Sequence, residues 1–403
     1  MAEMIHAKTV KPRIFPWNND CTPAQIDRAQ TLGGDLTLGQ EKQYEINRDG
    51  KLGVKKNTPG CTVALRQFEY GSIAFWRKLA NKEDPLSAAL DESVTLEDLK
   101  TSKFDIAAYL TDDNSDFRGT IWFPKLRVNG FSLNIADPDA IIERNFDLVG
   151  EDYKILDGKY FSFQQETASG ATVNMVLSPV PIEYASEEYI YRVLRVRSGV
   201  VTELEKTTDW TYTSGTHTLA VTGCSIGDII KAYYPSDTAY TTLWTDNDVD
   251  VDFLTASYCE IRLKVGTGTR IYRLQSVGLD AAFDRADYKE IGNSEIVLTG
   301  VNNKTITISL DRYSTDFALE DILASDTTYP YIDPRDFADN IQLQVKVYND
   351  KEHSVFKIGW LVTGLSPTAL SSAQEVETYN KRTNTLESDN FKISCDETEI
   401  EFL

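Results

Sequence analysis

One group of residues in this sequence resembles a catalytic site. Gly223-Cys224-Ser225-Ile226-Gly227 has the Gly-x-Ser-x-Gly spacing of a nucleophile elbow, and Asp336 and His353 follow in the Ser, Asp, His order of α/β-hydrolases. An elbow of that kind needs a helix directly after the serine, whereas Asp228 to Tyr234 alternates between apolar and polar residues like a strand. We therefore interpret the pentapeptide as a tight turn and expect no enzymatic activity and no catalytic residues.

A run of aspartates resembles a calcium-binding loop. Asp246-Asn247-Asp248-Val249-Asp250-Val251-Asp252 clusters the oxygen ligands that hard cations prefer. It lacks the glycine at the sixth position and the glutamate at the twelfth that an EF-hand requires. We interpret it as an acidic, exposed strand, with ion binding from Asp246 to Asp252 as the open alternative, and predict no metal site.

The remaining motifs predict no cofactor either. Gly266-Thr267-Gly268 lacks the third glycine and the following helix of a dinucleotide site, so it indicates a turn. Three arginines that alternate along one predicted strand are too few for a nucleic-acid patch and indicate a solvated strand face: Arg192, Arg195 and Arg197. The three histidines have no ligand spacing, and the five cysteines include no Cys-x-x-Cys pair, which indicates small buried residues and no zinc site or disulfide scaffold: His6, His217, His353, Cys21, Cys61, Cys224, Cys259 and Cys395.

Composition predicts a soluble protein of several domains. The chain has 403 residues, of which 41% are hydrophobic, enough for two or three ordinary cores. Its formal net charge of −21 argues against a protein whose main task is to grip nucleic acid, because phosphate binding depends on Lys and Arg. The N-terminus has no apolar core typical of a signal peptide, and no run of residues has membrane-spanning length, so we expect synthesis in a cytosol and no membrane partner.

One stretch of the sequence occurs twice. Gln30 to Phe68 aligns without a gap to Gln275 to Tyr313, 245 positions later, with eight identical positions. That is roughly three times what unrelated residues would give. Farther on the agreement is looser: Val128 to Leu133 aligns with Val362 to Pro367, and Asp152 to Ile155 aligns with Asn390 to Ile393. We infer that one fold is used twice.

The first unit is expected to be a β-meander followed by helices. Turn residues separate the predicted strands Gln43 to Asn47, Lys51 to Lys56 and Cys61 to Phe68. Apolar spacing predicts a helix from Ile73 to Ala80 and a second one from Thr95 to Tyr109, before a strand from Gly119 to Ile135. Residues 1 to 29 indicate an irregular arm with a short helical turn at Pro23 to Ala29, of the kind that lies on a neighbour.

The middle and the end of the chain are also expected to be rich in strands. The central strands predicted are Tyr189 to Arg197, Val200 to Glu205, His217 to Thr222 and Asp228 to Tyr234. In the second unit we predict a helix at Asp316 to Ala324 and the strands Tyr258 to Val265, Glu295 to Thr299, Lys304 to Leu310, Ile341 to Tyr348 and Val355 to Thr363. The predicted division is residues 1–157 for the first unit with its arm, 158–257 for an inserted, autonomous β-sandwich on the outside, and 258–403 for the second unit.

The order of these elements resembles that of tail tube proteins of long-tailed bacteriophages. The resemblance rests on the meander and helix from Tyr44 to Ala80, on the strand Pro124 to Ser132, and on the segment Ile142 to Asp152. It covers both units, roughly three quarters of the chain, and contains no short diagnostic motif. It implies a mainly β fold: two tube-type β-sandwich or half-barrel domains with flanking helices, plus a small immunoglobulin-like sandwich. Here that extra sandwich lies between the copies, whereas the family carries it at the C-terminus.

The resemblance also implies a function and partners. The chain would be a virion structural protein that assembles with itself into stacked rings forming a siphovirus tail tube, the conduit for DNA ejection. Tape measure and tail terminator or tip proteins would be its other partners, and double-stranded DNA would pass without specific binding. It would be assembled in the host cytoplasm and reside in the virion tail.

Two further expectations follow from chain geometry and charge. Exposed sheet edges favour pairing between chains, so three chains would close into a ring with six tube domains, a pseudo-hexamer. The lumen would be acidic, and Arg77 and Lys78 of one helix would face Glu320 and Asp321 of the other across a seam. The alternative function is a virion-surface or extracellular β-sandwich that binds carbohydrate or a host surface, with aromatic platforms at Tyr189, Tyr191, Trp210, Tyr233, Tyr234 and Trp244.

Overall fold

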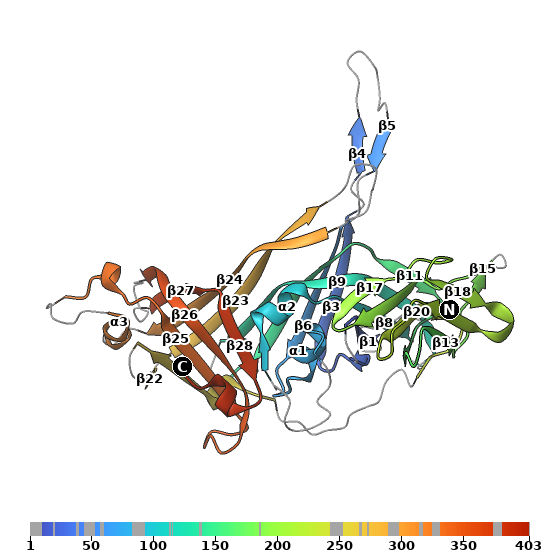
Figure 1. Ribbon diagram of the computed structural model, residues 1–403. Helices are drawn as coiled ribbons and strands as arrows, with labels where there is room; N and C mark the ends of the chain where they lie inside the picture. The colour runs from blue at the N-terminus through green and yellow to red at the C-terminus, as the bar shows by residue number, and fades with distance from the viewer. Residues whose placement is uncertain are drawn as a thin grey trace, which may run out of the picture.

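The structure is a computed structural model in which the N-terminal part of the chain (blue and cyan) lies between the central part (green) and the C-terminal part (orange and red) (Figure 1). It describes residues 10–18, 21–37, 40–43, 53–56, 60–82, 93–112, 114, 116–136, 139–184, 187–241, 253–265, 268–271, 274–288, 298–313, 317–324, 331–373 and 381–402. Most described residues lie in β-strands, which confirms the predicted mainly β fold class.

The first copy of the repeat, as the name is used here, is residues 10–157. Its strands are β1 (Val10–Pro16), β2 (Ala24–Gln25), β3 (Ala29–Thr37), β4 (Gln40–Gln43), β5 (Gly53–Lys56), β6 (Gly60–Phe68), β7 (Ser93–Thr95), β8 (Phe104–Thr111), β9 (Phe117–Ile135), β10 (Glu143–Gly150) and β11 (Lys154–Asp157). Its helices are α1 (Ala74–Leu79) and α2 (Leu96–Thr101).

The second copy is residues 259–402. It contains β21 (Cys259–Lys264), β22 (Gly268–Arg270), β23 (Leu274–Tyr288), β24 (Leu298–Tyr313), α3 (Ala318–Leu323), η4 (Pro334–Asp336), β25 (Ile341–Tyr348), β26 (Phe356–Ala373), β27 (Lys381–Ser388), β28 (Asn390–Ser394) and η5 (Glu397–Ile400). The short 3-10 helix η3 (Ala256–Tyr258) leads into it.

The strand pairing of the first copy recurs in the second in the same register. In the first copy Leu32 pairs with Leu65, and 245 positions later Val277 pairs with Leu310. A bulge between Ala29 and Thr31 also recurs, between Leu274 and Ser276. The two stretches that align in the sequence therefore have the same strand register and the same bulge.

The later strands recur as well, at slightly different spacings. β27 corresponds to β10 with an offset of 238 residues. The pairing of β10 with β9 has a bulge between Asp147 and Leu148, and the pairing of β27 with β26 has one at the equivalent place, between Thr385 and Leu386. The looser sequence alignment of Val128 to Val362 is wrong, because pairing places Val128 opposite Leu148 and Pro367 opposite Leu386. Val128 therefore corresponds to Pro367, 239 positions later, which is five positions beyond the residue that the sequence alignment matched with it.

Each copy is a sandwich of two sheets that share one long strand. One end of β9 pairs with β8 and β11, and the other end pairs with β10. In the second copy β26 likewise pairs with β25 and β28 at one end and with β27 at the other. A single apolar core runs through both copies, and includes Val63, Phe131, Leu279, Ile308 and Leu343.

Three sequence-based predictions for the first copy need correction. The described part of the N-terminal arm is not irregular, because β1 pairs with β8 as β21 pairs with β25 in the second copy. The helical turn expected at Pro23 to Ala29 is also wrong: β2 lies there and pairs with β1, as β22 pairs with β21. The helix predicted from Thr95 to Tyr109 ends at Thr101, and Phe104–Thr111 is the buried strand β8. A strand buried on both faces has apolar residues at every spacing, so its pattern also fitted a helix.

Most other elements lie where the sequence places them. The helices α1 and α3 and the strands β6, β9, β21, β25 and β26 overlap their predicted ranges. Residues 44–52 and 57–59, where the turns of the meander are predicted, lie outside the described residues.

The inserted strands form three small sheets, and two of these enclose a core of their own. They are β12 (Tyr160–Thr167), β13 (Thr172–Val176), β14 (Glu183–Tyr184), β15 (Glu187–Glu188), β16 (Arg192–Arg197), β17 (Val200–Glu203), β18 (Trp210–Thr213), β19 (Thr218–Thr222) and β20 (Ile229–Ser236), with η2 (Ser214–Thr216). The two sheets that enclose the core have the orders β12-β20-β16-β17 and β13-β19-β18, whereas β14 and β15 pair only with each other. Both small sheets contribute to the core, which includes Val173, Trp210, Leu219 and Ile230.

Candidate assembly surface

The two copies are joined by strand pairing within the chain. The end of β9 pairs antiparallel with β23, with Ser132 opposite Asp280 and Phe131 opposite Ala281. This joint makes one continuous sheet, called the long sheet here, with the order β3-β6-β10-β9-β23-β24-β27-β26. Its outermost strands β3 and β26 have no strand on their outer side among the described residues.

The joint is closed by side chains on the core side of the long sheet. Phe391 of β28 packs against Phe131 of β9 and Trp76 of α1, with ring centroids 5.1 Å and 6.3 Å apart. A second strand pairing, β28 with β7, places Ile393 opposite Val94, and both are fully buried. Arg285 Nε donates to the carbonyl oxygen of Val128 at 3.0 Å. The joint is therefore a packed interface as well as a backbone ladder.

The other face of the long sheet is polar and acidic. Cross-strand register puts the following acids on it: Asp35, Glu143, Asp147, Asp280, Asp284, Asp311 and Glu387. Arg66 and Lys381 lie on the same face, and each is ion-paired there, with Glu143 and with Asp311. Burial and the nearby Asp147 raise the pKa of Asp280, as expected where acids repel one another across strands.

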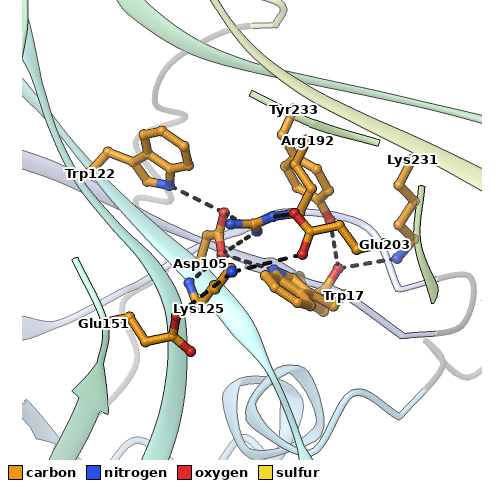
Figure 2. A network of polar contacts seen from close by, with 10 residues as sticks. Trp17, Asp105, Trp122, Lys125, Glu151, Arg192, Glu203, Lys231 and Tyr233 are labelled. Atoms are coloured by element: carbon orange, nitrogen blue, oxygen red, sulfur yellow. Dashed lines mark hydrogen bonds and ion pairs between the residues drawn. The ribbon is translucent and has the colours of Figure 1, made fainter. Parts of the chain in front are cut away.

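A polar cluster is centred on Asp105 and Arg192, whose side chains are both fully buried (Figure 2). Asp105 of β8 accepts hydrogen bonds from the indoles of Trp17 at 2.8 Å and Trp122 at 3.2 Å, and from the backbone N–H of Lys125 at 2.9 Å. Arg192 of the insertion donates to both Asp105 oxygens, at 3.2 and 3.3 Å. Burial opposes the charge on Arg192, yet Asp105 beside it raises the pKa of the guanidinium.

This cluster fixes the insertion to the first copy. The side chains of Arg192 and Asp105 are both fully buried, and an adjoining apolar cluster contains Phe15 and Trp122 from the first copy and Phe161 and Tyr233 from the insertion. Lys231 also donates to the backbone carbonyls of Pro16, Asn18 and Cys21. The insertion thus has its own core but shares a second one, so it is less autonomous than its sequence suggested.

The residues of the hydrolase-like pattern are spread over distant elements. Ser225 lies in an exposed turn of the insertion, while Asp336 ends η4 and His353 stacks on Tyr348, both in the second copy at the opposite end of the molecule (Figure 1). The turn is held by Asp228, which accepts from Ser225 N at 2.7 Å and from Arg197. The Gly-x-Ser-x-Gly spacing therefore builds a tight turn before β20.

The predicted solvated face of the arginine strand holds for the exposed Arg197 and the half-exposed Arg195 but is wrong for Arg192. Arg192 is buried in the Asp105 cluster, while Arg195 and Arg197 both donate to the carbonyl of Gly223 at 3.0 Å. The predicted charge seam fails too: Arg77 and Lys78 are buried, and Glu320 is ion-paired inside the second copy with Arg312 and Arg382.

The aromatic platforms of the alternative function are largely internal. Trp210, Tyr233 and Tyr234 are buried and Tyr191 is half-buried, whereas Tyr189 is exposed. Trp244 and the aspartate run Asp246 to Asp252 lie outside the described residues, as do His6, Gly266 and Thr267. In the described part of the chain no group of three or more acidic, cysteine or histidine side chains is placed to hold a metal ion.

The cysteines form no disulfide bond among the described residues. All five cysteines are free; Cys21, Cys61 and Cys224 are buried, and Cys259 and Cys395 are half-buried. Burial, with Asp152 and Asp35 nearby, raises the pKa of the Cys61 thiol to about 11, so it stays protonated. None of the described helices has the length and apolar character needed to cross a membrane.

Comparison with known proteins finds a weak likeness among the solved structures. No protein-family model matches the sequence. No curated protein matches it either. A solved chain of the anti-feeding prophage cap, a tube terminating cap, resembles 38% of this chain over 98% of its own length, with 17% sequence identity and a TM-score of 0.28. We draw no argument from a likeness at that score.

Proposed function

We propose that the chain is a structural virion protein that assembles with itself into stacked rings forming a phage-type tail tube. The observation that carries the proposal is the internal joint: two copies of one fold are joined edge to edge, and the resulting sheet ends in strands β3 and β26 without outer partners. An exposed sheet edge is a template for pairing with another chain. Because β3 and β26 are different edges, their contact is heterologous and either closes into a ring or continues as a filament.

Ring closure by three chains would place six copies around one axis. The long sheet would then become a closed barrel without edges. Its acidic face would line the lumen, since the other face is packed against the core of each copy. Such a lining repels DNA phosphates, whereas each Lys or Arg contact would add affinity and slow passage. Tape measure and tail terminator proteins would be the further partners, and the tail of the virion the location.

Electron microscopy of the purified protein tests this function. Rings or tubes with an open lumen are the expected result. Dispersed monomers at every concentration, together with binding to a glycan array, would favour the carbohydrate-binding alternative. The buried positions of Trp210, Tyr233 and Tyr234 make that second result the less expected one.

A further inference from the structure

We infer that a second copy of the chain docks on the β26 end of the molecule in the register of the internal joint. This inference rests on the proposed function and specifies its contact. The β26 end is defined here as Ala369 to Ala373 with the segment Tyr331 to Asp333. The β3 end is defined as Gly33 to Thr37 with Tyr153 to Leu156.

The first support is that residues buried at the internal joint have exposed counterparts at the chain's two ends. Phe131 of β9 is 3% exposed, while Leu370, at the corresponding position of β26, is 39% exposed. Ile393 of β28 is fully buried, while its counterpart Ile155 of β11 is 69% exposed. Each end of the molecule therefore exposes an apolar side chain whose counterpart at the internal joint is buried by the other copy.

The second support is a cavity at the β26 end. It has a volume of about 700 Å³ and is lined by Phe317, Glu320, Tyr331, Leu370 and Arg382, among others. At the internal joint the corresponding place is filled by Phe391, which contacts Trp76 and Phe131. The cavity is thus the place where a neighbouring copy inserts a ring.

The ring that would enter this cavity is Tyr153. It corresponds to Phe391 by the spacing of 238 positions that relates β10 and β11 to β27 and β28. In helix α3, Glu320 takes the place that Trp76 has in α1, and both are buried. The internal joint therefore pairs Phe391 with an indole, whereas the contact between chains would pair a phenol with a carboxylate. A hydroxyl suits that polar site and would be costly beside Trp76.

The internal register then predicts the pairs between chains. Ser132 opposite Asp280 becomes Ser371 opposite Asp35 of the next chain, and Phe131 opposite Ala281 becomes Leu370 opposite Leu36. The register cannot extend to Ala369. Its counterpart at the internal joint is Gly130, where a Cβ atom would lie only 2.7 Å from the carbonyl oxygen of Ala281. We therefore expect the ladder between chains to begin at Leu370.

A second ladder would form on the outer sheet. β7 precedes α2, and Thr95 caps that helix; Tyr331 to Asp333 likewise precedes η4, which Asp333 caps. The pairing of Ile393 with Val94 then predicts Ile155 opposite Ile332 between chains. Lys154 would lie opposite Asp333 of the neighbouring chain. The contact between chains would therefore pair opposite charges, whereas the equivalent pair at the internal joint is Lys392 with the uncharged Thr95.

Disulfide trapping tests the register. The chains Ser371→Cys and Asp35→Cys are made separately, mixed, assembled and oxidised. We expect a covalent dimer of one chain of each kind, because directly opposed residues in antiparallel strands bring their Cβ atoms within disulfide range. The variant Ser132→Cys/Asp280→Cys is the positive control, since it tests the same pair inside one chain. Wild-type protein controls for the native cysteines.

Mixing Ser371→Cys with Thr31→Cys is the matched negative control, because Thr31 lies on the same face of β3 as Asp35 but four residue pairs further along. Rings that form but cross-link through Thr31, or through neither site, would overturn the register while leaving the proposed function standing. Absence of any assembly, with the internal control disulfide formed, would overturn both. Tyr153→Phe should weaken assembly measurably, and unchanged assembly would contradict the role of Glu320 in the cavity.

Discussion

The buried ion pair of Arg192 with Asp105 contributes to the stability of the fold. The guanidinium of Arg192 compensates the fully buried carboxylate of Asp105, and it also stacks over Trp17 at 4.1 Å. Removing one partner of a buried ion pair leaves an uncompensated charge, which typically costs about 3–5 kcal/mol.

We therefore predict that Arg192→Met lowers the free energy of unfolding by about 3–5 kcal/mol, measured by chemical denaturation. Arg195→Ala is the matched control from the same strand, because Arg195 donates to an exposed turn and its loss should cost less than about 1 kcal/mol. Equal stability of the two variants would show that Arg192 does not hold the insertion in place.

A pH-dependent contribution is expected from the turn before β20. The hydrogen bond from Arg197 lowers the pKa of Asp228 below its usual value. A carboxylate with a lowered folded-state pKa stabilises the fold above its unfolded pKa, and that contribution is lost as the pH falls through the folded value.

The stability difference between wild type and Arg197→Gln should therefore be largest near neutral pH and shrink below about pH 4. Thermal unfolding followed from pH 7 downward measures it. A difference that stays constant across this range would mean that Arg197 acts through packing on the turn and not through the charge of Asp228.

At the scale of elements, the edge strand β26 carries the sharpest prediction. Leu370 is exposed in the single chain, so Leu370→Asp should change monomer stability by no more than about 0.5 kcal/mol while abolishing assembly. Analytical ultracentrifugation reports the assembly and thermal unfolding the stability. Val200→Asp in the insertion is the matched control, since Val200 is also an exposed apolar residue but lies outside the proposed contact.

Continued ring formation by Leu370→Asp would exclude β26 from the contact. Phe131→Ala gives the complementary result, because Phe131 is buried at the internal joint. It should cost about 3–5 kcal/mol in monomer stability, as expected for a large core aromatic.

The sequence predicted elements well where pattern and turn chemistry agree. β6 has alternating buried and exposed residues, and the two aligned stretches correctly predicted a shared register. It failed at β1, where Lys11, Pro12 and Arg13 obscure a strand whose place is set by pairing with β8. It also failed at β8, since burial on both faces leaves no period to detect.

The candidate surface could be predicted in kind but not in detail. An edge-to-edge contact follows from a duplicated β-fold, yet the joint depends on long-range pairing of β9 with β23 that no local pattern encodes. The burial of Arg192 was missed for the same reason, because Asp105 is 87 residues away in the chain. The identity of Asp35 and Asp280 in the alignment was a sequence signal that both copies could form the same strand contact, because Asp280 pairs with Ser132 at the internal joint.

At the scale of the whole molecule, the duplication explains why one chain can present two different ends. In the proposed assembly the internal joint would be a folded template of the contact between chains. The differences at Tyr153, Glu320 and Lys154 would then distinguish contacts between chains from those within one. Such differences favour the alternating order of copies, because a first copy docked on another first copy would oppose Tyr153 to Trp76.

The most direct test of this account is a cryo-EM reconstruction of the assembled particle with its subunit count. We predict three chains per ring, β26 of each chain paired with β3 of the next, and the acidic face of the long sheet turned to the lumen. A ring of six chains, or a lumen lined mainly by Lys and Arg, would contradict the account.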